Sequence, residues 1–188
     1  MLLQFSVTNH RSIKDTAIIS LKASTDKSLS DCLISPDDKK QLVPVLALYG
    51  ANAAGKSNVL HALLLMREMV CGRYAKLLKG EALPQEPFAF TEQPPQPTSF
   101  EVIYFYNGIK YAYGFSFDKA KILTEYLYHW PNGREALIFF QRRQWLSVPR
   151  EYSGAVYPCR THRRKPALPV QLQRVELPPD REGLSVVL

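Results

Sequence analysis

Eight consecutive residues, from Gly50 to Ser57, match the pattern G-x-x-x-x-G-K-[ST] and could bind phosphate groups. The two glycines leave room for backbone N–H groups to turn inward and form a nest for an anion. Lys56 would place its ammonium between the β- and γ-phosphates of a nucleotide, and the Ser57 hydroxyl would complete the coordination of a Mg²⁺ ion. A helix after the loop would direct the positive end of its dipole at the same phosphates. The pattern therefore predicts a nucleotide phosphate site.

Such a loop needs a strand before it and a helix after it, and the sequence predicts both. Residues 42–49 form a nearly unbroken apolar run, which is typical of a strand covered on both faces in a parallel sheet. Pro44 limits the ladder to the residues after it. From Ser57 to Leu78 apolar residues recur at helical spacing, and Gly80 would end the helix. These flanks disfavour the alternative interpretation, an accidental glycine-rich turn.

The composition is that of a globular chain, with 188 residues of which 46% are hydrophobic and 22% charged. The sequence has no apolar stretch of about 18 residues and no signal-peptide core, so we expect a cytoplasmic protein without a membrane partner. The three cysteines, Cys32, Cys71 and Cys159, are far apart in the sequence and form no C-x-x-C pair. This spacing favours reduced structural thiols over a zinc site or a disulfide framework.

A formal net charge of +7 raises the question of a nucleic-acid partner. Much of the positive excess follows Arg142, where no aromatic stacking platform accompanies it. We therefore favour a solvated basic tail over a nucleic-acid site.

The remaining apolar patterns predict antiparallel strands. Alternation over 3–7 and again over 17–22 indicates an N-terminal hairpin, and a long flexible loop is expected over 23–40. After a proline-rich connector at 81–97, the sequence predicts a β meander with strands at 100–106, 109–117, 122–130 and 136–141. Asn107-Gly108 suits a tight two-residue turn between the first two of these strands. The aromatic stripe of the second strand could stack a base, but a packed core is favoured.

Two motifs together carry a resemblance to a known family: Asn9-His10-Arg11-Ser12-Ile13 at the N-terminus, and the loop with its flanks from Ala47 to Asn58. They resemble the N-terminal part of bacterial ABC/SMC-like AAA-family ATPases, relatives of the overcoming-lysogenization-defect and RecF-type proteins, several of which act in phage defence or DNA repair. The resemblance covers residues 1–147. It implies an α/β fold: a P-loop NTPase lobe of ABC/SMC type, with a mixed sheet and an antiparallel β meander. His10 departs from the aromatic residue usual at its position.

The resemblance also implies a set of ligand-binding residues for ATP and Mg²⁺. The residues expected to bind the triphosphate are Gly50, Ala51, Asn52, Ala53, Ala54, Gly55, Lys56, Ser57 and Asn58, with Ser57 as the metal ligand. Asn9 and Arg11 are expected to lie near the nucleotide.

Part of the machinery for hydrolysis is missing from the sequence, and no catalytic residue is assigned. No apolar strand after the loop ends in the Asp or Glu that would hold Mg²⁺ through water and orient the attacking water. A Leu-Ser-Gly-Gly-type signature is also absent. We therefore expect ATP binding that is incomplete for hydrolysis by this chain alone, and whether the chain is an enzyme stays open.

Residues 148–188 change character, because prolines alternate with arginines and periodicity disappears. We interpret 1–147 as the first lobe of a partial ATPase domain, and 148–188 as a poorly ordered or non-native tail, such as a frameshift or truncation would produce. An ordinary disordered extension is the alternative.

Three functions remain compatible with the sequence. The first is an ATPase lobe that closes, as a homodimer or with a missing second lobe, around DNA or a defence effector. The second is a non-hydrolysing nucleotide-binding remnant or interaction module. The third is a basic nucleic-acid-binding protein.

Overall fold

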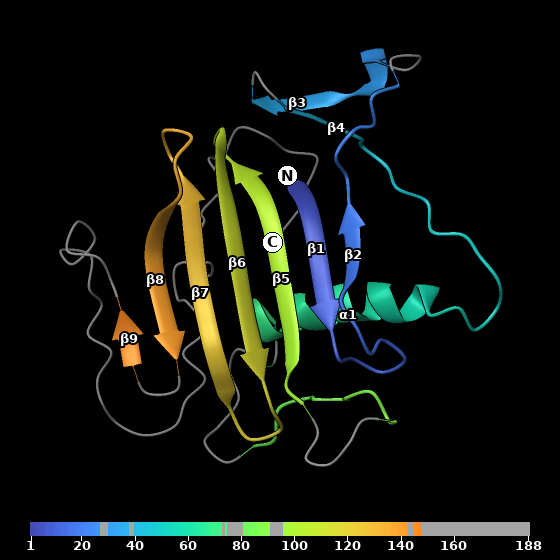
Figure 1. Cartoon of the computed structure of the whole chain (residues 1–188), viewed down its shortest axis with the longest axis vertical. Coiled ribbons are helices and arrows are strands. Elements are labelled where there is room, and N and C mark those ends of the chain that lie inside the picture. The colour runs from blue at the N-terminus through green and yellow to red at the C-terminus, as the bar shows by residue number, and fades with distance from the viewer. Residues whose placement is uncertain are drawn as a thin grey trace.

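The large sheet dominates the architecture, with one helix lying across its strands (Figure 1). A computed structural model of the chain describes residues 1–26, 30–37, 40–72, 74, 81–90, 96–142 and 145–147. The expected tail, 148–188, lies outside the described residues. The elements are β1 (Leu2–Thr8), β2 (Ala17–Ser20), the 3-10 helix η1 (Ser30–Cys32), β3 (Ile34–Asp37), β4 (Lys40–Leu42), α1 (Lys56–Val70), β5 (Thr98–Tyr106), β6 (Ile109–Phe117), β7 (Ile122–Trp130), β8 (Ala136–Arg142) and β9 (Trp145–Ser147).

The seven strands of the large sheet run in the order β2-β1-β5-β6-β7-β8-β9, and each neighbouring pair is antiparallel. The predicted N-terminal hairpin and the predicted meander are both confirmed, and β1 joins them by pairing with β5, where Phe5 lies opposite Val102. Asn107 and Gly108 form the expected tight turn, with φ angles of 48° and 75°. Strand β9 was not predicted.

The core lies between α1 and one face of the large sheet. Helix α1 buries one side of its surface on this face, with buried side chains in successive turns. These side chains are those of Ala62, Met66, Met69 and Val70. Phe100 of β5 and the aromatic stripe of β6 meet them, with Tyr113, Phe115 and Phe117 each at most 1% exposed. The aromatic stripe of β6 is therefore part of the packed core, as expected.

The predicted strand before the phosphate loop is wrong. Only β4, which ends at Leu42, forms a strand there, and residues 43–50 belong to no strand. Val45 is 77% exposed and Tyr49 is 93% exposed, although the prediction placed both in a buried strand. A strand of this type needs hydrogen-bonded neighbours at both edges and apolar layers on both faces. Within the described residues no strand pairs with 43–50, and the sheet is antiparallel rather than mixed.

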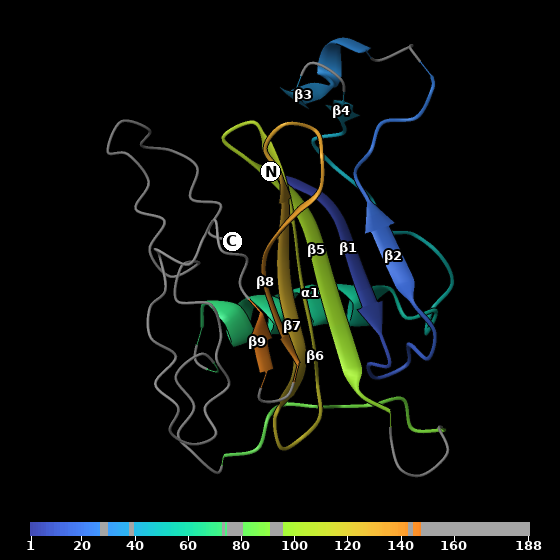
Figure 2. The ribbon, with the colours of Figure 1, turned by 60° about the vertical axis from the view of Figure 1, so that its left-hand side comes forward.

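The loop expected over 23–40 also contains regular structure. Strands β3 and β4 form a small separate sheet beyond one end of the large sheet, as both views show (Figures 1 and 2). The backbone N–H of Lys40 donates a hydrogen bond to the Asp37 carboxylate (2.7 Å), which stabilises the connection between the two strands. Helix α1 is shorter than predicted, because Cys71 forms its C-cap. Of the residues expected to continue the helix as far as Leu78, 73 and 75–78 lie outside the described part of the chain.

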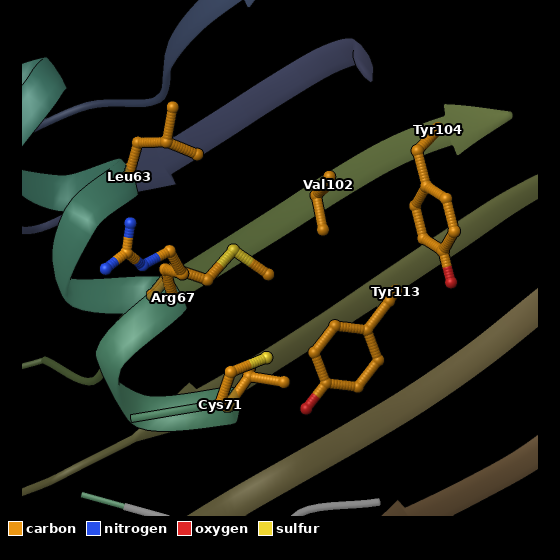
Figure 3. Close-up of a pocket in the computed structure, with 8 residues that line it drawn as sticks. Leu63, Arg67, Cys71, Val102, Tyr104 and Tyr113 are labelled. Carbon is orange, nitrogen blue, oxygen red and sulfur yellow. The ribbon is translucent and has the colours of Figure 1, made fainter. Parts of the chain in front are cut away.

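A cavity of about 60 Å³ lies between the C-terminal half of α1 and strands β5 and β6 (Figure 3). Tyr113 is one of its lining residues, and its hydroxyl donates a hydrogen bond to Oε1 of Glu125 on β7 (2.8 Å). Glu125 is 1% exposed, and its other carboxylate oxygen has no partner among the described residues. Burial raises the pKa of Glu125 to about 8, so the carboxyl is mostly protonated at neutral pH.

Candidate nucleotide-binding site

The loop at 50–55 adopts a left-handed backbone at three positions, as a concave phosphate-binding loop requires. Gly50, Ala53 and Gly55 have φ angles of 151°, 63° and 85°. Helix α1 begins at the next residue, Lys56, and no side chain in the described structure caps its N-terminus. The first N–H groups of a helix lack intrahelical partners, and here no side chain takes that place. The end of α1 is therefore suited to an anion.

Lys56 lies within the loop itself. Its Nζ donates hydrogen bonds to the carbonyl oxygens of Gly50 (2.9 Å) and Ala51 (2.6 Å), at the beginning of the loop. These acceptors are neutral and lie close to solvent. A charged phosphate oxygen could therefore take their place as the stronger hydrogen-bond acceptor for the Lys56 ammonium. The lysine is thus already directed at the loop that would hold the phosphates.

The other loop residues leave the site accessible to solvent. Those exposed are Ala51, Asn52, Ala53, Ala54 and Ser57. The Ser57 hydroxyl fits the chemistry expected of a Mg²⁺ ligand, because Mg²⁺ in nucleotide sites takes few protein ligands and completes its shell with phosphate oxygens and water. Within the described ranges no three His, Cys, Asp or Glu side chains gather into a separate metal site.

The N-terminal turn lies directly against the phosphate loop. Asn58 Nδ2 of α1 donates a hydrogen bond to Ser12 Oγ (2.6 Å), and a side chain at Gly55 would meet the same oxygen at 3.3 Å. The two motifs that carry the family resemblance are therefore neighbours in space. Asn58 uses its amide to join them in this structure, and Ser12 is a site residue that sequence reasoning did not single out.

Asn9 holds this turn to two distant parts of the chain. Its side-chain amide donates to the Gln96 carbonyl (2.5 Å), and its Oδ1 accepts a hydrogen bond from the Phe88 backbone N–H (2.9 Å). The Thr98 hydroxyl donates to the Asn9 carbonyl (2.7 Å). Asn9 is 4% exposed, so in this structure its side chain supports the turn from within.

Arg11 forms a forked ion pair with Glu86. Its Nε donates to Oε2 (2.7 Å) and its Nη2 to Oε1 (3.2 Å), while its backbone N–H donates to the Glu86 carbonyl (2.7 Å). This hydrogen bonding raises the pKa of Arg11 and lowers that of Glu86. Sequence reasoning missed Glu86, because one acidic residue in a proline-rich connector carries no distinguishing pattern.

His10 occupies an apolar site in the same turn. The residue is 1% exposed, its ring meets Phe100 edge-on with centroids 5.8 Å apart, and neither ring nitrogen has a partner within the described structure. Burial lowers the pKa of His10, which disfavours the charged form. These surroundings suit the aromatic residue that the family resemblance places at this position.

Residues 45–155 match the family described as "AAA domain, putative AbiEii toxin, Type IV TA system". The chain belongs to this AAA-domain family. The match includes the phosphate loop, α1 and the meander, and it begins after the N-terminal turn. Membership supports a nucleotide-binding function of the P-loop ATPase type. No curated protein matches the chain.

Cys32 and Cys71 are free thiols, and Cys159 lies outside the described residues. The described part of the chain contains no helix with the length and apolar character needed to cross a membrane.

Proposed function

We propose that the chain binds ATP with Mg²⁺ through residues 50–58. One observation carries the proposal: a loop with three left-handed residues leads into a helix whose N-terminus has no side-chain cap. The Lys56 ammonium is hydrogen-bonded to the first residue of this loop, Gly50. Backbone N–H groups of the loop and of the first helical turn would donate hydrogen bonds to the phosphate oxygens. Membership of an AAA-domain family supports this assignment.

Each polar residue of the loop has its own task in this proposal. Lys56 exchanges the Gly50 and Ala51 carbonyls for phosphate oxygens, and Ser57 offers its hydroxyl to Mg²⁺. A Mg²⁺ ion held by Ser57 would supply positive charge that offsets the negative charge of the phosphates. Arg11 contributes positive charge from the adjacent turn, and Asn9 holds that turn in place. Preference for ATP over other nucleotides rests on the family, since the loop contacts phosphates and not the base.

The proposal is tested by titrating the protein with a fluorescent ATP analogue, with and without Mg²⁺. We expect Lys56→Ala to weaken binding by about tenfold or more in both conditions, because it removes charge-assisted hydrogen bonds to phosphate. Ser57→Ala should weaken binding mainly when Mg²⁺ is present. Lys121→Ala, in the turn between β6 and β7, is the control for loss of one lysine and should bind like the wild type. Binding that survives Lys56→Ala unchanged would refute the assignment.

We also propose that this chain does not complete ATP hydrolysis by itself. In the sequence after the loop, no run of four apolar residues ends in Asp or Glu, and no Leu-Ser-Gly-Gly-type signature occurs. The exposed apolar residues at 45–49 support a second lobe or subunit that covers this segment and supplies the carboxylates for hydrolysis. That such an arrangement is of ABC/SMC type, related to overcoming-lysogenization-defect and RecF-type proteins, rests on the sequence resemblance. Purified protein should bind ATP without releasing phosphate. Steady phosphate release that disappears in Lys56→Ala would contradict this part of the proposal.

A role in defence of the cell against phage is the biological setting that we propose. The family description names a putative toxin of a type IV toxin–antitoxin system, which is one kind of system in which a cytoplasmic ATP-binding chain could act. A DNA or protein effector would then be the target of the nucleotide-bound state. Loss of phage protection in cells carrying Lys56→Ala, at unchanged protein level, is the outcome that this setting predicts.

A further inference from the structure

We propose that Glu86 is a positioning residue, which holds the Arg11 guanidinium in place for the nucleotide bound at residues 50–58. This inference rests on the proposed ATP binding and adds a residue that lies outside the phosphate loop and outside the N-terminal turn. Glu86 does not itself meet the phosphates; it acts through Arg11.

Glu86 is hydrogen-bonded to both the side chain and the backbone of Arg11. The carboxylate accepts from Nε (2.7 Å) and Nη2 (3.2 Å), and the Glu86 carbonyl accepts from the Arg11 backbone N–H (2.7 Å). A forked arrangement of this kind fixes the plane of the guanidinium as well as its position. The remaining guanidinium N–H groups have no partner among the described residues, so they stay available for an anion.

The segment that carries Glu86 is itself anchored to the sheet. The Leu83 backbone N–H donates to the Lys119 carbonyl (2.9 Å), and the Gln85 side chain donates to the Phe117 carbonyl (3.4 Å). On the other side of Glu86, the Phe88 N–H donates to Asn9 Oδ1 (2.9 Å). Both flanks of Glu86 are thus held, which allows its carboxylate to act as a fixed support.

The backbone of Arg11 needs such a support. Its φ angle of 51° lies in the left-handed region, which is unfavourable for a residue with a side chain and persists where surrounding contacts impose it. The hydrogen bond to the Glu86 carbonyl is one of these contacts. The next residue, Ser12, is bonded to Asn58 in the first turns of α1 (2.6 Å). Glu86 therefore fixes the position of Arg11, whose neighbour in the chain, Ser12, contacts the helix that follows the phosphate loop.

The solvent exposure of the Arg11–Glu86 ion pair indicates that Glu86 contributes little to the stability of the fold. The Arg11 and Glu86 side chains are 35% and 55% exposed, and ion pairs at such surfaces contribute little to folding. A substitution at Glu86 should therefore leave the unfolding of the nucleotide-free protein nearly unchanged. Its effect should appear when the nucleotide binds.

The test is a double-mutant cycle on Mg-ATP affinity, with Glu86→Gln, Arg11→Ala and both together. Glu86→Gln keeps the shape of the side chain but removes its charge and one strong acceptor. We expect it to weaken binding by about threefold to tenfold, and to have little further effect once Arg11 is Ala. The matched control is Glu68→Gln, which breaks the exposed pair between Arg67 and Glu68 (3.3 Å) near the other end of α1. This control should bind Mg-ATP like the wild type.

The outcomes separate this inference from the proposed function. Wild-type affinity in Glu86→Gln, together with weaker binding in Arg11→Ala, would overturn the positioning role and leave ATP binding intact. Tighter binding in Glu86→Gln would also overturn it, because it would show a carboxylate that competes with the phosphates. A lower melting temperature of nucleotide-free Glu86→Gln at unchanged affinity would show a purely structural contact. Failure of the wild type to bind Mg-ATP would overturn both proposals.

Discussion

At the scale of single residues, the N-terminal turn beside the phosphate loop contains a polar side chain whose burial is unfavourable. His10 is this side chain: its buried ring loses its hydration, packs edge-on against Phe100, and leaves both nitrogens without a hydrogen-bond partner among the described residues. Its neighbours Asn9 and Arg11 both have left-handed backbones, and hydrogen bonds hold both of them. Strain and unsatisfied groups are thus concentrated in the turn that touches the phosphate loop.

We predict that His10→Phe stabilises the protein by about 1–2 kcal/mol at pH 7.5, because it removes buried groups without partners. Burial lowers the pKa of His10 in the folded state below the usual value of 6.5, so the unfolded state binds the proton more readily. The wild type should therefore lose stability as the pH falls below about 6.5, and the advantage of His10→Phe should grow. Urea unfolding at pH 7.5 and pH 5.5 measures both effects.

The control for this prediction is His61→Gln, since His61 is an exposed histidine on α1. Its unfolding free energy should follow that of the wild type at both pH values. An equal or lower stability of His10→Phe at pH 5.5 would contradict the structural interpretation of this turn.

At the scale of secondary-structure elements, pairing between strands decides which side chains share the core. The register of β6 and β7 places Glu125 opposite Phe115, on the face that α1 covers, within reach of the Tyr113 hydroxyl. Strand β7 therefore brings an ionisable group into an apolar layer. The pKa of about 8 for Glu125 follows from this burial, which the hydrogen bond from Tyr113 only partly offsets.

We predict that Glu125→Gln changes how stability depends on pH. The folded-state pKa of about 8 lies above the usual value of 4.5, so from pH 4.5 upward the unfolded state releases a proton that the folded state retains. The stability of the wild type should therefore fall as the pH rises from 4.5 to 8. The stability of Glu125→Gln should not show this fall, because the amide side chain does not ionise. Relative to the wild type, the variant should gain roughly 1–3 kcal/mol between pH 5 and pH 8.

Denaturant unfolding at the two pH values tests this prediction. Glu135→Gln, which removes an exposed carboxylate, should show no comparable gain. The burial argument would be wrong if Glu125→Gln and the wild type responded to pH in the same way.

At the scale of the whole molecule, the described fold leaves one apolar segment without cover. Residues 45–49 lead into the phosphate loop with Val45, Leu46, Leu48 and Tyr49 exposed, and Leu60 and Leu64 of α1 are exposed as well. Several large apolar side chains exposed within one short segment are typical of a site of association. Its position next to the loop suggests that nucleotide binding and association are coupled.

We predict that Mg-ATP promotes self-association of the chain. Static light scattering should show the mass rising toward that of a dimer when Mg-ATP is added, and Leu46→Ser should reduce this change because it makes the exposed segment more polar. Ile18→Ser removes an exposed apolar side chain on β2 and serves as the control. A mass that does not respond to Mg-ATP would contradict the coupling.

The sequence by itself determined the features that depend on neighbouring residues in the chain. Glycine and small residues at set positions predict the left-handed loop before α1, and Asn107-Gly108 with alternating flanks predicts the central hairpin, because both rely on local backbone preferences. Tertiary structure alone decided the rest. Arg11 meets Glu86 across 75 positions of sequence, and no periodicity marks such a pair. The apolar run at 42–49 resembles a buried strand, but a strand forms only where other chain segments complete its hydrogen bonds, and in the described structure they do not.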